Sequence, residues 1–159
     1  MSPPPASPTY SGWKKTPLPS SILPTTESIF VLPTNDPSLV VKATNPARSI
    51  CVARFDEKLF AFAVGCECCK IPLTESKLLP PDDKETVNST CKSTDPRLIC
   101  AFCGACYNLR TGKPLPDAVG AEKTGNMLGG FTRNSMKAER KGMRVFELAE
   151  EKGMVLYKV

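Results

Sequence analysis

The sequence predicts a mostly β protein, a small sandwich or barrel built from short strands. Apolar runs of five to seven residues recur along the chain, and turn-forming Asn, Asp, Gly and Pro separate them. No segment shows a sustained apolar repeat of 3.6 residues, which an amphipathic helix would require. With 159 residues, the chain is long enough for a single domain with a modest core.

The expected strands divide into an early group, a pair around a cysteine motif and a closing pair. Two hairpins are expected, one with Arg54-Phe55-Asp56-Glu57 before its second strand and one with Glu150-Glu151-Lys152-Gly153 between its strands. Two stretches are expected to be loops, Leu79–Arg97 and Gly120–Gly142. The expected strands are Ser28–Leu32, Leu39–Ala43, Ser49–Arg54, Lys58–Val64, Leu98–Phe102, Ala105–Leu109, Met143–Ala149 and Met154–Lys158.

The N-terminal segment is rich in proline, with nine of the sixteen prolines in the first 37 residues. Proline fixes φ and lacks a backbone N–H, so this stretch is expected to be extended instead of regular sheet or helix. We therefore expect an arm over residues 1–27 that docks on another chain, and a domain over residues 28–159. The arm has no apolar h-region, which excludes a secretory signal. Its Ser, Thr and Pro content is compatible with a processed organellar precursor.

Charge and composition exclude several functions. The net charge of +5 suits an acidic protein partner, and no nucleic-acid-binding signature accompanies it. No apolar run reaches the 18 residues of a membrane-spanning helix, so a membrane complex would be reached by docking. The chain has no histidine, which removes the commonest acid–base and nucleophile-activating groups. We therefore do not expect an enzyme.

All eight cysteines lie between Cys51 and Cys106, and this clustering indicates either a metal site or a set of disulfides. One group is Cys66-Glu67-Cys68-Cys69, and the second runs from Cys100 through Cys103 to Cys106. Two loops of this kind can bring four thiolates to a soft metal centre, zinc or iron–sulfur. Disulfides, or a scaffold without metal, are the alternatives. Cys51, Cys91 and Cys106 are expected to be structural or free thiols.

The two cysteine groups and their flanks resemble the Rieske family. That family has C-x-H in one loop and C-x-x-H-G in the next, followed by an aromatic residue, a leucine and T-G. Here Cys68 and Cys103 stand where the family has histidine. The matching positions are Cys66, Cys68, Pro72, Leu73, Cys100, Cys103, Gly104, Tyr107, Leu109, Thr111 and Gly112.

The resemblance implies a Rieske-like β-sandwich or barrel with two cluster loops, over 66–73 and 100–112. It also implies a [2Fe–2S] cluster held by Cys66, Cys68, Cys100 and Cys103, with Cys69 as an alternative ligand to Cys68. The implied function is one-electron transfer, alone or as a subunit of a photosynthetic or respiratory complex. The alternative is a structural or assembly subunit whose domain binds zinc or no metal.

A basic stretch near the end of the second long loop is a candidate docking patch for that partner. A solvated loop is the alternative explanation for these charges. The candidate docking residues are Arg133, Lys137, Arg140, Lys141 and Arg144.

Overall fold

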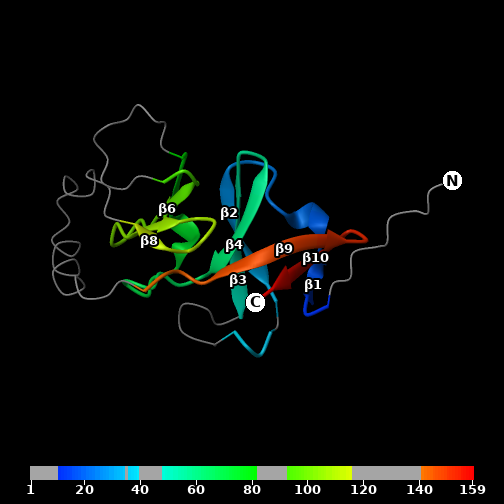
Figure 1. Ribbon diagram of the computed structural model, residues 1–159. Coiled ribbons are helices and arrows are strands. Elements are labelled where there is room, and N and C mark those ends of the chain that lie inside the picture. The colour runs from blue at the N-terminus through cyan, green and yellow to red at the C-terminus, as the bar shows by residue number, and fades with distance from the viewer. Residues whose placement is uncertain (1–10, 35, 40–47, 82–92, 116–140) are drawn as a thin grey trace.

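Two antiparallel sheets make up the protein (Figure 1). The computed structural model describes residues 11–34, 36–39, 48–81, 93–115 and 141–159. Within these ranges the regular elements are strands and two 3-10 turns, η1 (Ser20–Ile22) and η2 (Leu73–Glu75). The predicted mostly β fold is therefore confirmed. No helix in these ranges is long and apolar enough to cross a membrane.

The larger sheet has six strands in the order β1-β10-β9-β4-β3-β2. Strand β9 joins its two halves, because its last five residues pair with β10 and its first two, Val145 and Phe146, pair with β4. The strands are β1 (Lys14–Pro19), β2 (Ser28–Pro33), β3 (Ser49–Phe55), β4 (Lys58–Ala63), β9 (Val145–Glu151) and β10 (Met154–Lys158).

Both predicted hairpins are present in the larger sheet. Phe55 pairs with Lys58 across the β3–β4 turn, and Glu151 pairs with Met154 across the β9–β10 turn. Both turns have two central residues with positive φ, Asp56-Glu57 and Lys152-Gly153. Two such residues are the requirement of the tight hairpin turn whose twist matches that of the strands.

The smaller sheet has four strands in the order β5-β6-β7-β8. It lies beside the larger sheet, with β6 and β8 to the left in Figure 1. The sequence predicted longer strands around the second cysteine group, but β6 ends before Cys100 because a turn begins there. The bounds are β5 (Lys77–Leu79), β6 (Arg97–Ile99), β7 (Cys106–Asn108) and β8 (Pro114–Leu115).

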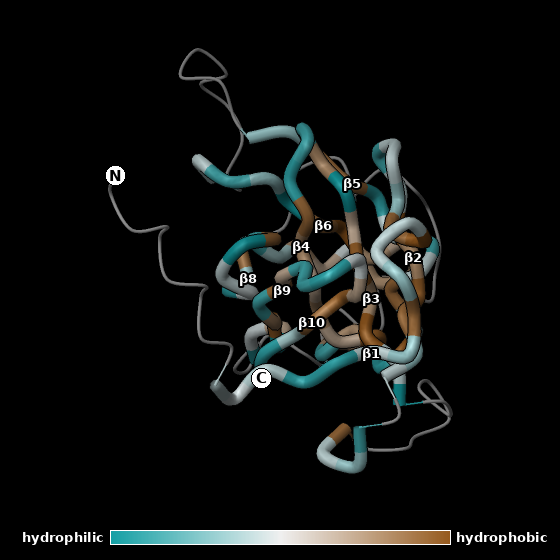
Figure 2. Tube along the Cα trace, turned by 90° about the vertical axis from the view of Figure 1, so that its right-hand side faces the viewer, coloured by the Kyte–Doolittle hydropathy of each residue, from teal (hydrophilic) through white to brown (hydrophobic). Residues whose placement is uncertain are grey.

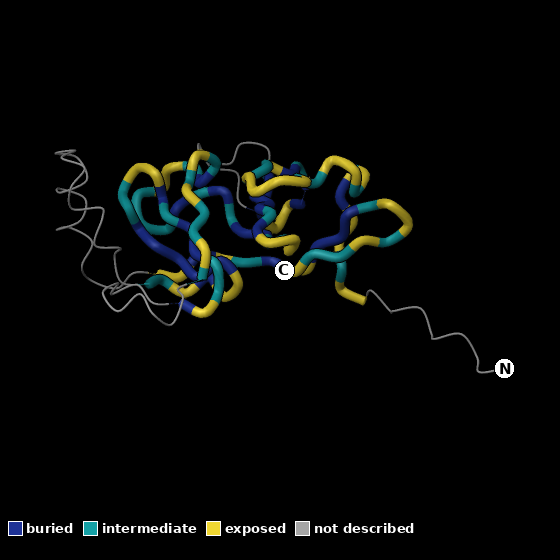
Figure 3. The backbone as a smooth tube through the Cα atoms, turned by 90° about the horizontal axis from the view of Figure 1, so that it is seen from above, coloured by how far each residue is buried: buried dark blue, intermediate teal, exposed yellow. Residues whose placement is uncertain are grey.

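The β3–β4 hairpin is buried on both faces, and this places it between two hydrophobic clusters. Along β3, Cys51 and Ala53 belong to the cluster shared with the smaller sheet, while Ile50 and Val52 belong to the cluster shared with β9 and β10. This alternation is the two-residue period of a strand. Figure 2 shows hydrophobic stretches concentrated on the strands, and Figure 3 shows exposed residues at the loops.

The described part of the expected arm contains a strand. Residues 14–19 form β1, which pairs with β10 at the edge of the larger sheet, so this segment belongs to the domain. The prolines do not prevent this, because an edge strand tolerates a missing N–H. The pairing register shifts between Lys15 and Pro19, as at a β-bulge. Residues 1–10 and the expected strand residues 40–43 lie outside the described ranges.

Candidate metal centre

Four cysteine sulfurs meet between the two sheets. The Sγ atoms of Cys66, Cys69, Cys100 and Cys103 all lie within 4.8 Å of one another. The Cys66–Cys103 separation is 3.8 Å and the Cys69–Cys100 separation is 3.7 Å. Cys66 and Cys69 come from the loop after β4, and Cys100 and Cys103 come from the turn between β6 and β7.

The first loop is a tight turn closed by two backbone hydrogen bonds. The Lys70 N–H donates to the Cys66 carbonyl at 2.9 Å, and the Cys66 N–H donates to the Ile71 carbonyl at 2.8 Å. Lys70 adopts a φ of 63°, which non-glycine residues rarely adopt. Its ammonium donates to the Glu67 carbonyl at 2.8 Å and pairs with the Glu67 carboxylate at 2.9 Å. These contacts hold the lysine over its own loop.

The second loop repeats the same turn. The Gly104 N–H donates to the Cys100 carbonyl at 3.0 Å, and the Cys100 N–H donates to the Ala105 carbonyl at 2.9 Å. Gly104 has a φ of 73°, in the place that Lys70 occupies in the first loop. In each loop, therefore, the two cysteines that belong to the four-sulfur group are three positions apart in the sequence, with two residues between them.

Two of the four grouped cysteines are buried in the hydrophobic core, and two are only partly buried. Cys66 and Cys100 are buried members of the hydrophobic cluster beneath the smaller sheet. Cys69 and Cys103 are only partly buried. Phe102 and Ile71, one from each loop, are exposed at 45% and 40%. The group thus lies close to the protein surface, beside two exposed apolar side chains.

A buried tyrosine hydroxyl reaches one of the sulfurs. The Tyr107 hydroxyl lies 3.3 Å from the Cys66 Sγ. Burial raises the pKa of Tyr107, so this phenol stays protonated and is available as a donor to a thiolate. Hydrogen bonds from Cys100 and Cys103 hold the pKa of Cys66 well below its usual range. The thiolate form of Cys66 is therefore favoured.

Two other thiols of the group, Cys69 and Cys103, are harder to ionise. Burial raises the pKa of Cys69 to about 12. The pKa of Cys103 is also raised, chiefly because its neutral thiol is hydrogen-bonded with Cys100 and Cys66. A metal ion would displace the protons that these thiols hold, because thiolate is the coordinating form.

Three of the four predicted ligands, Cys66, Cys100 and Cys103, lie in the four-sulfur group. The fourth member is Cys69, the residue named as an alternative, and not Cys68. The reason is the shape of the first turn, which brings together thiols three residues apart. Cys51 and Cys106 are buried outside the group, and Cys91 lies outside the described residues. None of the seven described cysteines forms a disulfide, which does not support the disulfide alternative.

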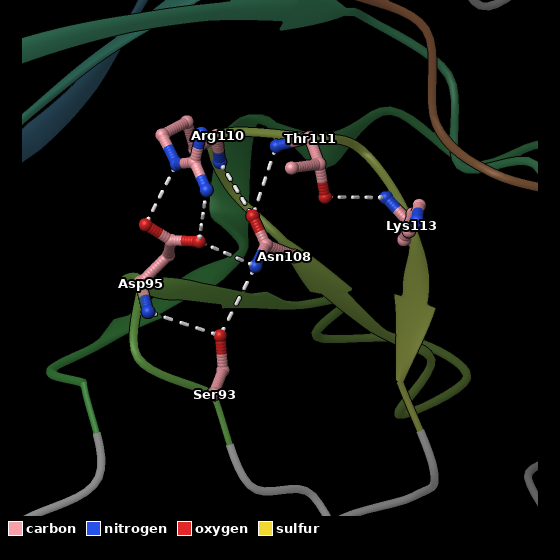
Figure 4. Close-up of polar contacts among 6 residues, drawn as sticks. All are labelled: Ser93, Asp95, Asn108, Arg110, Thr111 and Lys113. Carbon is pink, nitrogen blue, oxygen red and sulfur yellow. Dashed lines mark hydrogen bonds and ion pairs between the residues drawn. The ribbon is translucent and has the colours of Figure 1, made fainter.

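A polar network, missed by the sequence analysis, fixes the far end of the β6–β7 hairpin (Figure 4). The Asn108 side-chain oxygen accepts from the Arg110 and Thr111 backbone N–H groups, both at 2.9 Å. Its amide donates to Ser93 at 3.1 Å and to Asp95 at 3.0 Å. The sequence signal for this network was Asn108, three positions before Thr111 of the T-G motif. The network holds the chain that follows the second cysteine loop.

Only part of the candidate docking patch falls in the described residues. Lys141 and Arg144 are exposed, and the Arg144 guanidinium lies 5.3 Å from the centre of the Phe146 ring. The other three residues, Arg133, Lys137 and Arg140, lie outside the described ranges. The docking role of these five basic residues therefore stays a prediction.

Fold and site together define a small β domain with a metal-binding group of four cysteines in two loops. Four thiolates suit zinc or iron, which are the metals that sulfur-rich tetrahedral sites select. No protein-family model matches the sequence, and the search of curated proteins gives no match.

Among solved structures, the chain is similar to one in the "complex of reduced oxygenase and oxidized ferredoxin in carbazole 1,9a-dioxygenase". The TM-score is 0.50 and the sequence identity is 17%, over 92% of this chain and 93% of that one. At this identity the likeness shows the fold alone. It confirms the predicted Rieske-like β fold.

Proposed function

We propose that this chain is an electron-transfer protein, or a subunit of a larger redox complex, that holds iron with four cysteine thiolates. The observation that supports it best is the four-sulfur group formed by Cys66, Cys69, Cys100 and Cys103. The partial exposure of Cys69 and Cys103 supports it further, because electron exchange between proteins needs a centre close to the surface.

Iron would supply the one-electron chemistry, and the protein would supply binding and shielding. The four thiolates would hold the metal, and the cluster beneath the smaller sheet would exclude water from its inner side. The chain contains no histidine, so proton uptake at a histidine ligand is not available. We expect the midpoint potential to change little between about pH 6 and 9, because histidine is the side chain that ordinarily titrates there.

The proposed partner is a protein, or a large complex reached by docking. Lys141 and Arg144 are exposed basic residues that suit an acidic surface. Residues 1–10, which precede β1 and lie outside the described ranges, are a second candidate contact. We propose an organellar setting, with a chloroplast favoured over a mitochondrion, on the family resemblance and the composition of the N-terminal segment. No enzymatic activity of its own is proposed.

A structural zinc site is the second candidate function. It is favoured by the separations of 3.8 and 3.7 Å between sulfurs of different loops. A tetrahedral ion with zinc–sulfur bonds of about 2.3 Å requires separations of about 3.8 Å. In that case the domain would act as a scaffold in an assembly.

Redox titration of the purified full-length chain tests the proposed function. Iron content, visible absorption and electron paramagnetic resonance would be followed while the potential is lowered at pH 6, 7.5 and 9. The proposal predicts bound iron that gains and loses one electron reversibly, with little dependence on pH. A colourless protein containing zinc, with no reducible centre, would support the scaffold instead.

A further inference from the structure

We infer that the four-cysteine site takes a single tetrahedral metal ion, bound by Cys66, Cys69, Cys100 and Cys103, and does not take a two-iron cluster. This inference rests on the proposed metal-binding role and deepens it. It departs from the [2Fe–2S] cluster and from the Cys68 ligand that the sequence resemblance implies.

The separations between sulfurs provide the first argument. A two-iron cluster places one pair of thiolates on each iron, so sulfurs on different irons lie roughly 5–7 Å apart. Here no pair of the four Sγ atoms is separated by more than 4.8 Å. Two pairs between the loops, Cys66–Cys103 at 3.8 Å and Cys69–Cys100 at 3.7 Å, match the edge of a single tetrahedron of about 3.8 Å.

The backbone of the two loops provides a second argument. In each loop the N–H four residues after the first cysteine donates to that cysteine's carbonyl, and the cysteine's own N–H donates to the carbonyl five residues on. The residue after the second cysteine has positive φ in both loops, Lys70 at 63° and Gly104 at 73°. Two equal turns face each other, and each offers two thiols to the same point.

The equal turns also explain which thiol of the first loop is used. In the second loop the two grouped cysteines, Cys100 and Cys103, have two residues between them. The first loop repeats this spacing with Cys66 and Cys69, whereas Cys66 and Cys68 do not. Cys68 packs against the hydrophobic cluster and lies outside the four-sulfur group. It is therefore the matched control for Cys69 in the same loop.

The experiment is metal and sulfide analysis of the full-length chain and two variants, Cys69→Ser and Cys68→Ser. Iron, zinc and acid-labile sulfide would be counted per chain in protein as purified. Each protein would also be titrated with Co²⁺ under reducing conditions, with the thiolate charge-transfer absorption as readout. Circular dichroism would establish whether each variant is folded.

We expect one metal ion per chain, no labile sulfide and a Co²⁺ endpoint at one equivalent. Cys68→Ser should keep that endpoint. Cys69→Ser should weaken binding by more than the roughly 10–100-fold that follows loss of an outer-shell partner. If Cys69→Ser does not fold, the stoichiometry and sulfide content of the unaltered chain and of Cys68→Ser still decide the matter.

Two irons with two sulfides per chain would overturn the inference and leave the proposed electron-transfer function standing. One zinc without iron would uphold the inference and remove that function. Loss of metal from Cys68→Ser but not from Cys69→Ser would overturn the assigned ligands. A chain that binds neither Co²⁺, zinc nor iron would overturn both proposals.

Discussion

At the scale of single residues, the Tyr107 hydroxyl contacts one sulfur of the site. Its hydroxyl lies 3.3 Å from the Cys66 Sγ, and its ring is buried in the adjoining cluster. The sequence resemblance pointed to an aromatic residue at this position but not to this contact. A hydrogen bond to a charged acceptor stabilises the form with more negative charge.

We predict that Tyr107→Phe lowers the midpoint potential of the iron-loaded protein. Loss of a hydrogen bond with a net value of about 1 kcal/mol corresponds to roughly 40 mV for a one-electron couple. Metal stoichiometry should stay the same, because the phenol is not a ligand. Redox titration of both proteins measures the shift. An unchanged or raised potential would show that the hydroxyl does not donate to the ligand sulfur.

At the scale of elements, Gly112 allows close backbone contact between two segments. One is the turn after β7, and the other is the chain that leads into β9. Gly112 has a φ of 72°, and a Cβ there would lie 1.9 Å from the Met143 carbonyl oxygen. The Met143 N–H donates to the Gly112 carbonyl at 2.7 Å. The glycine thus permits a backbone contact that joins the two sheets.

We predict that Gly112→Ala destabilises the protein by about 2–4 kcal/mol, because a steric clash adds to the cost of positive φ. Gly153→Ala is the matched control. Gly153 has a φ of 75° with nothing within 4 Å of an added Cβ, so only the cost of about 1 kcal/mol for positive φ applies. Urea unfolding measures both. Equal losses would contradict the close approach.

A buried carboxylate ties the segment after β2 to two strands of the larger sheet. The Tyr157 hydroxyl donates to Asp36 at 2.6 Å, and the Lys14 ammonium lies 2.7 Å from the same oxygen. The Ser38 N–H donates to its other oxygen at 2.9 Å. Burial opposes ionisation, but these three donors together hold the pKa of Asp36 well below its usual value.

We predict that Asp36→Asn lowers the free energy of unfolding by about 1–3 kcal/mol at pH 7. Since the folded pKa lies below the unfolded value of about 3.9, the carboxylate stabilises the fold above about pH 4. This stabilisation fades as the pH falls further toward the folded pKa. The difference between the two proteins should therefore shrink below about pH 4.

Urea unfolding at pH 7, 4 and 3 measures this difference. Asp56→Asn, at an exposed turn position, is the control and should change stability little at any of these values. A difference for Asp36→Asn that stays constant with pH would show that its charge does not contribute.

At the scale of the whole molecule, the site joins the two sheets. Cys66 follows β4 of the larger sheet, and Cys100 follows β6 of the smaller one. Both side chains belong to one hydrophobic cluster, while the second cluster, around Leu32 and Tyr157, lies on the other face of the β3–β4 hairpin. The second cluster contains no member of the four-sulfur group.

We predict that removal of the metal with a chelator lowers the thermal unfolding midpoint but leaves a folded protein. A ligand that binds only the folded state stabilises it, and the second cluster does not depend on that ligand. Circular dichroism of the loaded and stripped chain measures the change. Complete unfolding on chelation would show that the second cluster cannot sustain the fold, and an unchanged midpoint would contradict a metal that joins the sheets.

Much of the fold was predictable because strand periodicity and turn residues are local signals. The β2, β3, β4, β9 and β10 strands were expected within about two residues. Strand β1 was missed because its prolines hide an edge position that only the pairing with β10 reveals. The two short outer strands of the smaller sheet, β5 and β8, have too few residues to show a period.

The site was predictable to the level of two cysteine loops and three of the four grouped thiols. The choice between Cys68 and Cys69 was not, because it depends on the hydrogen bonds of the first turn. The spacing of the second loop, Cys100 and Cys103, was the signal that favoured Cys69. The Asp36 contacts were likewise hidden, because their partners are distant in the sequence.

X-ray absorption at the edge of the bound metal measures the shell of atoms around the ion itself. For a single ion held by the four cysteines we expect four sulfur neighbours at about 2.3 Å and no second metal in the scattering. The spectrum of Cys68→Ser should be the same. A metal–metal contribution, together with bridging sulfide, would contradict a single ion held by Cys66, Cys69, Cys100 and Cys103.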